Sequence, residues 1–106
     1  MIFVVIGKDK GQGELRREER PGHLEFVADQ QHLILYAGPL LEEGRMVGSV
    51  FIFDVADRAA LDAYLAKDPY FIRPIFETIE IYESKRMVPE AEPGFLRAEA
   101  ERSRSA

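Results

Sequence analysis

The chain has 106 residues, of which 46% are hydrophobic, and its formal net charge is −5 at pH 7. That length predicts one domain with a modest core, and the negative charge, without a cluster of Lys and Arg, argues against nucleic acid as a partner. Because the sequence has no cysteine and no apolar run that approaches the roughly 20 residues needed to span a bilayer, we expect a cytoplasmic protein with no membrane partner.

The chain opens with a strand signal and a glycine-rich loop. Residues 3–6 are aromatic or β-branched, which favours a strand. Three glycines among polar residues over 7–13 predict a loop. The spacing of these glycines matches neither the dinucleotide-binding fingerprint nor the P-loop, so no bound cofactor is expected.

The next segment has a helical pattern from Glu14, but it contains a proline. Pro21 lacks an N–H group and clashes with the preceding turn, so it is disfavoured in a helix interior. We therefore expect a short turn over 14–19 and a main helix that has Pro21 at its first position and ends near Gln31. The apolar stripe that this helix should turn toward a sheet consists of Leu24, Val27 and Ala28.

A predicted β-hairpin follows this helix. Residues 33–36 form the second strand, and Gly38 and Pro39 are expected to end it with a special backbone geometry that can also line a cleft. Residues 42–45 make the turn into a third strand over 46–55.

A second helix and a fourth strand complete the predicted domain. Asp57 is a good N-cap for a helix over 58–67. This helix should stop before Asp68, because Pro69 disfavours the α conformation in the residue that precedes it. Residues 76–83 predict the fourth strand.

The end of the chain has the composition of a tail. It contains two prolines and a polar terminus, and Phe95 and Leu96 are the apolar side chains that we expect it could dock on the domain. We expect one domain over residues 1–85 and a C-terminal tail over residues 86–106.

The order β-α-β-β-α-β predicts an α+β, ferredoxin-like fold, with four antiparallel strands and both helices on one face of the sheet. The first and third strands, which are central in this topology, are apolar on both faces. We therefore expect the helix-free face to meet a second copy of the chain about a two-fold axis, in a homodimer. The alternative is that the tail folds back over that face.

His23 and Asp68 are the candidate catalytic pair. His23 is expected in the first turn of its helix, where unsatisfied N–H groups disfavour imidazolium and leave a neutral imidazole that can act as a general base. Asp68 can orient one ring nitrogen and stabilise the imidazolium that forms. The alternative is structural: His23 caps the helix or fills a gap, and Asp68 only marks the end of the second helix.

Other residues are candidates for substrate binding. Arg20 or Arg17 can bind an anionic group beside His23, since guanidinium pairs well with carboxylate, although their spacing alone favours two solvated side chains. Ser49 is a hydroxyl on a central strand and is expected to hydrogen-bond a substrate rather than to act as a nucleophile. Tyr70 can wall a pocket near the pair. The two histidines form no recognisable metal-ligand pattern, so no metal is expected.

Four short motifs occur in order along the chain: Arg20-Pro21-Gly22-His23-Leu24, Tyr36-Ala37-Gly38-Pro39-Leu40, Val47-Gly48-Ser49-Val50 and Lys67-Asp68-Pro69-Tyr70. Together they resemble the YciI-like (YCII-related) family of small bacterial proteins over about residues 1–83. The resemblance implies a ferredoxin-like dimer that forms an α+β barrel. It also implies an active-site His–Asp pair, which maps onto His23 and Asp68, with a serine that matches Ser49. One enzyme that resembles the family removes chloride from a chlorinated hydroxyquinol.

Two functional hypotheses are consistent with these features. The leading one is a dimeric enzyme that uses His23 and Asp68 for proton transfer on a small anionic or aromatic metabolite, in an elimination, isomerisation or hydrolysis. The alternative is a non-catalytic dimeric module in which the same pocket holds a metabolite or a partner's peptide. The fold alone does not separate them, since ferredoxin-like barrels host both. An open pocket between sheet and helices, with the imidazole facing it, favours the enzyme.

Overall fold

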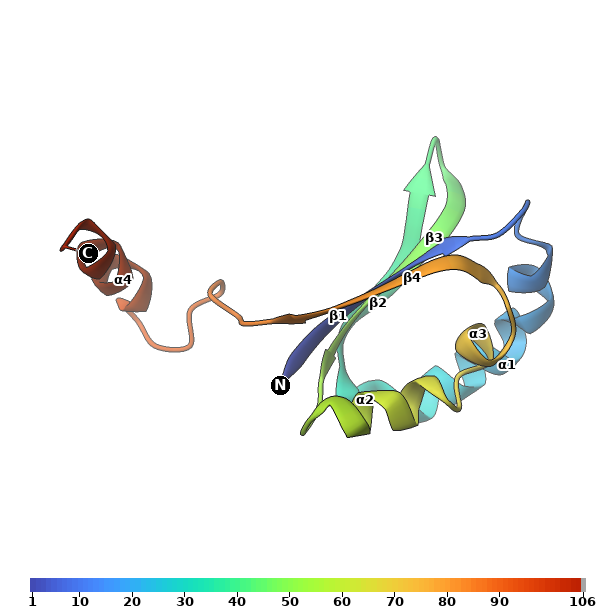
Figure 1. Cartoon of the computed structure of the whole chain (residues 1–106), viewed down its shortest axis with the longest axis horizontal. Coiled ribbons are helices and arrows are strands. Elements are labelled where there is room, and N and C mark those ends of the chain that lie inside the picture. The colour runs from blue at the N-terminus through green and yellow to red at the C-terminus, as the bar shows by residue number, and fades with distance from the viewer. Residues whose placement is uncertain (106) are drawn as a thin grey trace.

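The computed structural model describes residues 1–105, and its centre is a four-stranded antiparallel sheet in the order β2-β3-β1-β4. The strands are β1 (Ile2–Asp9), β2 (Ile34–Glu42), β3 (Arg45–Asp54) and β4 (Phe76–Ser84). The helices are α1 (Glu14–Gln30), the 3-10 helix η1 (Gln31–Leu33), α2 (Arg58–Leu65), α3 (Pro69–Ile72) and α4 (Phe95–Ser105). Figure 1 shows α1, α2 and α3 on one face of the sheet. The predicted α+β, ferredoxin-like order is confirmed, and residue 106, the last of the predicted tail, lies outside the described residues.

The strand register assigns the side chains to the two faces of the sheet. Residues directly opposite one another in paired strands project to the same side. The row on the helix side is Ala37, Phe51, Val5 and Ile81, and the row on the helix-free side is Tyr36, Ile52, Val4 and Tyr82. Phe51 and Val5 are buried, whereas Tyr36 and Tyr82 are 56% and 54% exposed. The helix-free face is therefore apolar and open to solvent.

The core lies between the helices and the other sheet face. Its buried side chains come from β1, from β3 and the residue after it, and from α2, and they are Phe3, Val5, Phe51, Phe53, Val55, Leu61 and Tyr64. A second, smaller cluster of Tyr70, Ile75 and Phe76 joins α3 to the start of β4. The second cluster forms the end of the domain where the candidate site lies.

Helix α1 differs from the predicted combination of a turn and a shorter helix. It is one helix over 14–30, with Pro21 inside it. The proline removes one backbone hydrogen bond, but the Glu, Leu and Arg residues before it are good helix formers, and Leu15 and Arg16 pack into the domain. His23 therefore lies in the interior of α1, and the predicted effect of helix-start N–H groups on its imidazole is wrong.

The face that α1 turns inward is mixed, and none of the residues of the predicted apolar stripe is fully buried there. Leu24 is 47% exposed, and with Val27 and Ala28 it lines a groove of 340 Å³ between α1 and β2. The buried residues of α1 are Arg16 and His23, which are about two helical turns apart. This helix therefore brings a buried arginine and a buried histidine against the sheet, in addition to the apolar side chains of Leu15 and Phe26.

Strand β2 continues through the residues that were expected to end it. Gly38 pairs with Val50 and Pro39 pairs with Ser49, so both lie within the strand, and the predicted end there is wrong. An edge strand tolerates a proline because half of its backbone groups have no neighbouring strand, and β2 is at the edge of this sheet. The turn of the hairpin lies where it was predicted, at residues 43–44.

Two aspartates are the N-caps of α2 and α3. As predicted, Asp57 caps α2, and its side chain accepts a hydrogen bond from the Ala60 N–H at 2.9 Å. Asp68 has an extended backbone and caps α3, in which Pro69 occupies the first helical turn. The sequence did not predict α3. This helix is a single turn that contains the buried Tyr70 and contacts α1.

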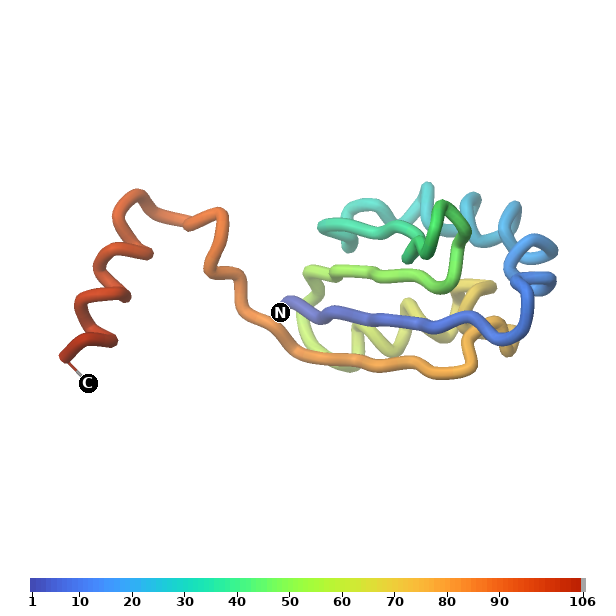
Figure 2. Tube along the Cα trace, turned by 90° about the horizontal axis from the view of Figure 1, so that it is seen from above, coloured from blue at the N-terminus to red at the C-terminus, as the bar shows by residue number. Residues whose placement is uncertain are grey.

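The chain after β4 leaves the domain. Figures 1 and 2 show α4 apart from the sheet and from the other helices in both views, and α4 contains no buried residue. All members of the two buried clusters precede residue 85. None of the helices in residues 1–105 has the length and apolar character that a membrane span requires.

A chain truncated after Lys85 should therefore fold as the full chain does. Because the tail supplies no buried side chain, we expect the free energy of unfolding in urea to change by less than about 0.5 kcal/mol, with the same cooperativity. Loss of cooperative unfolding in the truncated chain would show that the tail stabilises the protein, for example through a partner subunit.

Candidate active site

The predicted contact between His23 and Asp68 is present. His23 comes from α1 and Asp68 from the junction of α2 and α3, and the His23 Nδ1 lies 2.7 Å from the Asp68 Oδ1. Asp68 is fully buried, and His23 is 8% exposed. The two predicted catalytic residues thus form a hydrogen-bonded pair of which only the imidazole reaches a surface.

Two further donors hold the Asp68 carboxylate. The Tyr64 O–H donates to Oδ2 at 2.7 Å, and the Tyr70 N–H donates to Oδ1 at 2.9 Å. Burial, and then the nearby Asp68 charge, raise the pKa of Tyr64 far above its usual value, so its phenol stays protonated and remains a donor. The carboxylate therefore has a fixed orientation toward the imidazole.

Aromatic rings fix the plane of the imidazole. The Tyr70 ring stacks on it with a centroid distance of 3.6 Å and an interplanar angle of 2°, and Phe51 meets it edge-on at 6.0 Å. Because the carboxylate accepts from Nδ1–H, the lone pair of the neutral ring is on Nε2. This is the nitrogen that is free to exchange a proton with a ligand.

A pocket of 210 Å³ opens beside this imidazole, between α1 and the helix side of β2 and β3. The structure brings the predicted binding residues together there, since its lining includes His23, Arg20, Gly38, Pro39, Ser49 and Tyr70. Asp68 lies behind His23 and is not part of the lining. A cavity of about 150 Å³ is enough to hold benzene, so this pocket has room for one substituted ring.

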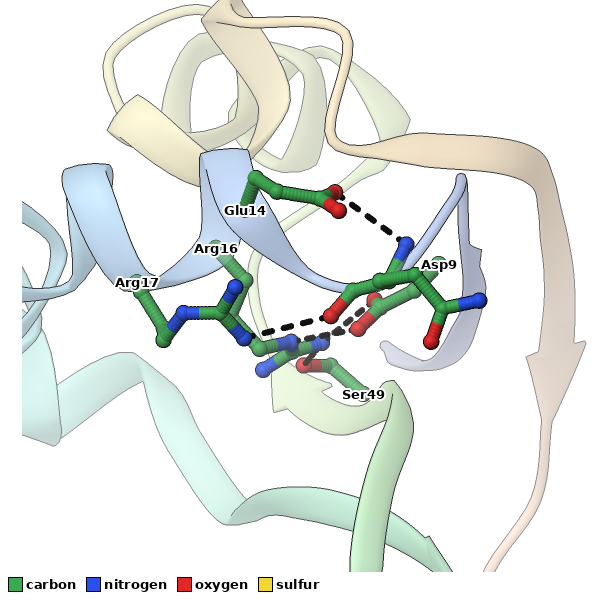
Figure 3. Close-up of polar contacts among 6 residues, drawn as sticks. Asp9, Glu14, Arg16, Arg17 and Ser49 are labelled. Atoms are coloured by element: carbon green, nitrogen blue, oxygen red, sulfur yellow. Dashed lines mark hydrogen bonds and ion pairs between the residues drawn. The ribbon is translucent and has the colours of Figure 1, made fainter.

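Arg16 and Asp9, which the sequence did not predict as site residues, form a buried ion pair at the same pocket. The Arg16 Nε and Nη2 donate to the two Asp9 carboxylate oxygens at 2.7 and 2.8 Å, and Nη2 also donates to the Ser49 Oγ at 2.8 Å. Figure 3 shows the three side chains converging from α1, β1 and β3. The available signal was the spacing of Arg16 and His23, which places them on one helix face.

The ion pair and the phenol of Tyr70 influence each other. Burial lowers the pKa of Arg16, but the hydrogen bonds and charge of Asp9 outweigh it, and the net pKa is above the usual value. Burial raises the pKa of Tyr70, although the Arg16 and Arg20 charges partly oppose this. The pocket therefore presents a permanent cation and a neutral phenol beside the imidazole.

Two other predicted features can be placed. The Ser49 hydroxyl accepts from Arg16, and its own O–H remains able to donate to a ligand. Arg20 has no carboxylate within ion-pair distance in the part of the chain that the structure describes. As for metals, residues 1–105 hold no group of three or more His, Cys, Asp or Glu side chains that could bind an ion together.

Comparisons with known proteins agree with this fold. Curated proteins include no significant match to the sequence. Among solved structures, 5-chloro-2-hydroxyhydroquinone dehydrochlorinase from Burkholderia phenoliruptrix AC1100, in complex with 2,5-dihydroxybenzoquinone, is similar with a TM-score of 0.77 and 21% identity, over 85% of this chain and 99% of that one. A cofactor-independent oxygenase from Streptomyces nogalater is similar with a TM-score of 0.51 and 17% identity, over 84% of this chain and 96% of that one.

The family comparison covers the whole ferredoxin-like part of the chain. The family model described as the YCII-related domain matches residues 1–85, from the start of the chain to just past the end of β4. This match agrees with the resemblance carried by the four sequence motifs, all of which lie inside the matched range. The chain therefore belongs to the YCII-related family.

Proposed function

We propose that the protein is an enzyme that performs acid–base chemistry on a small ring-containing metabolite, with His23 as the group that moves the proton. The observation that carries the proposal is an imidazole that faces a pocket while a fully buried carboxylate holds its other side at 2.7 Å. A histidine that only filled a gap in the core would have no need of an open pocket at its free nitrogen.

The proposed reaction begins with proton abstraction by the His23 Nε2. Asp68 keeps Nδ1 protonated and stabilises the imidazolium that forms, which makes it a positioning residue. The imidazolium then returns the proton to a leaving group or to another atom of the substrate. This sequence suits an elimination, an isomerisation or a hydrolysis.

The pocket suggests the substrate class. One ring fits its volume, and Arg20 can pair with an anionic substituent, while Ser49 and Tyr70 can hydrogen-bond oxygen substituents. Gly38 and Pro39 of β2 form part of the wall without a bulky polar group. A dehydrochlorinase of similar fold, solved with a dihydroxybenzoquinone, supports a small oxygenated ring as the substrate. These features together favour an anionic or aromatic metabolite.

The same proposal includes a cytoplasmic homodimer. The helix-free row of Tyr36, Ile52, Val4 and Tyr82 is apolar across all four strands, with the two tyrosines exposed and the two central residues half-buried. Such a face is typical of a surface that another molecule covers, and a second copy joined about a two-fold axis supplies a matching one.

Replacing His23 by Asn tests the proton-transfer role. We expect turnover on a panel of small ring-containing acids and phenols to fall by about 10² to 10⁴. Loss of the stack on Tyr70 should lower the free energy of unfolding by about 1 kcal/mol. Replacing Asp68 by Asn should reduce kcat less, because the base remains, but should destabilise the fold more, because the carboxylate holds three helices.

Two outcomes of these substitutions would contradict the proposed enzymatic function. Equal ligand affinity and no measurable turnover in the wild-type protein and in both variants would favour the non-catalytic binding module. A His23 variant that unfolds entirely, together with an active His23→Gln variant, would show that the imidazole is structural.

Replacing Tyr64 by Phe tests how Asp68 is positioned. The Asp68 Oδ2 would lose its hydroxyl donor, and we expect the free energy of unfolding at pH 7 to fall by about 1–3 kcal/mol. Because the pKa of Tyr64 is raised in the folded protein, the unfolded chain releases this proton near pH 10 and the folded chain does not, so wild-type stability decreases as the pH rises above about 10. The Phe variant should lose less stability over that alkaline range; an unchanged alkaline slope would contradict the raised pKa.

Replacing Val4 by Glu tests the dimer. A carboxylate in the centre of the helix-free face should convert the dimer to a monomer in sedimentation velocity at micromolar concentration. Ala63→Glu, which adds the same charge on the exposed side of α2, is the matched control and should stay dimeric. A monomeric wild-type protein would contradict the proposed assembly.

A further inference from the structure

A second cleft adjoins the His23 pocket. It has a volume of 580 Å³ and lies between the loop 11–13, the first turn of α1 and the start of β3. Arg16 and Met46 line both this cleft and the His23 pocket. A single ligand that extends past Arg16 and Met46 could therefore occupy the cleft and the His23 pocket together.

The cleft carries uncompensated positive charge. Three arginines line it, and Asp9 is the acidic residue in its lining. Asp9 is already paired with Arg16 through two hydrogen bonds. Within residues 1–105, neither Arg17 nor Arg45 forms an ion pair with a carboxylate, and Arg17 donates only to the Gln12 carbonyl, at 3.2 Å.

Nearby carboxylates do not cancel this charge. The Glu14 carboxylate accepts the Gln12 N–H at 3.1 Å and is not in the cleft lining. Figure 3 shows Glu14 and Arg17 approaching the loop from different sides. Glu42 is the register partner of Arg45 in the hairpin but forms no ion pair with it in the described chain. In a protein with a formal net charge of −5, this cleft is a local attractor for anions.

We propose that this cleft is a phosphoryl-binding subsite, and that the substrate places its ring in the His23 pocket and a phosphoryl group between Arg17 and Arg45. Two free guanidinium groups match a dianion, and their planar donors suit phosphate oxygens. The His23 pocket has room for one substituted ring, so a phosphoryl group carried by that ring would extend past Arg16 and Met46 into the adjoining cleft. The placement of the ring in the His23 pocket rests on the proposed function, whereas the binding of a phosphoryl group rests on the cleft alone.

Titration with inorganic phosphate, followed by calorimetry at low ionic strength, tests the phosphoryl end. Arg17→Gln and Arg45→Gln should each weaken phosphate binding by at least about tenfold. Arg58→Gln is the matched control, because Arg58 is an exposed arginine paired with Asp62 on α2, and its affinity should equal that of the wild type. No binding of phosphate, or the same affinity in all four proteins, overturns the subsite.

Phenyl phosphate tests the link between the two spaces, with phenol and inorganic phosphate as its separate halves. We expect phenyl phosphate to bind more tightly than either half and to shift the His23 ring signals in NMR spectra, whereas phosphate alone should leave them unchanged. Phenyl phosphate that binds no more tightly than phosphate, or leaves the His23 signals in place, overturns the link. Phosphate binding does not require turnover, so the two proposals can fail separately. Phosphate can bind the cleft of a protein that has no enzymatic activity, and an active enzyme can lack the phosphoryl subsite.

Discussion

One buried carboxylate joins three helices of this domain. Asp68 accepts from Tyr64 of α2, caps α3 through the Tyr70 backbone, and contacts the imidazole of His23 in α1. Removing a donor from a buried acceptor costs about 1–3 kcal/mol, and more when the acceptor is charged. The proposed chemistry and the placement of the helices therefore depend on the same side chain, so a substitution at Asp68 changes both at once. The orientation of His23 depends on Asp68, whereas Asp68 keeps its hydrogen bonds to Tyr64 and Tyr70 without His23.

Tyr70 connects this carboxylate to the second buried network. One face of its ring stacks on the imidazole, and the Arg16 guanidinium lies 4.9 Å from its centroid. Arg16 in turn is held by Asp9 and contacts Ser49. A buried ion pair often contributes no more to stability than apolar residues of the same size would. Arg16 and Asp9 are therefore better explained by what they do for the pocket, where they hold a cation and a hydroxyl in fixed positions beside the ring space.

Local signals in the sequence predicted the helix boundaries that are set by residues adjacent in the chain. Asp57 before a helix, and Asp68 before Pro69, follow from side-chain capping and from the restriction that proline places on the residue before it. The errors arose where the tertiary structure outweighed such rules. Pro21 stays inside α1, and the two buried residues of this helix, Arg16 and His23, are polar and border a pocket. No propensity scale would bury Arg16, since its burial depends on the geometry of the short loop between Asp9, at the end of β1, and the first turn of α1. The His–Asp contact was predicted correctly although one of its premises was wrong: Asp68 lies at the junction of α2 and α3, but His23 lies in the interior of α1 and not at its start.

The proline in β2 has a consequence for how the chain behaves in a crowded solution. The free edge of a sheet is a template onto which a strand of another molecule can add, and such addition is a common start of aggregation. β2 is an edge strand of nine residues, and Pro39, near its middle, cannot donate a backbone hydrogen bond to an incoming strand. The same residue that forms part of the pocket wall thus interrupts this edge of the sheet as a template for amyloid-like growth.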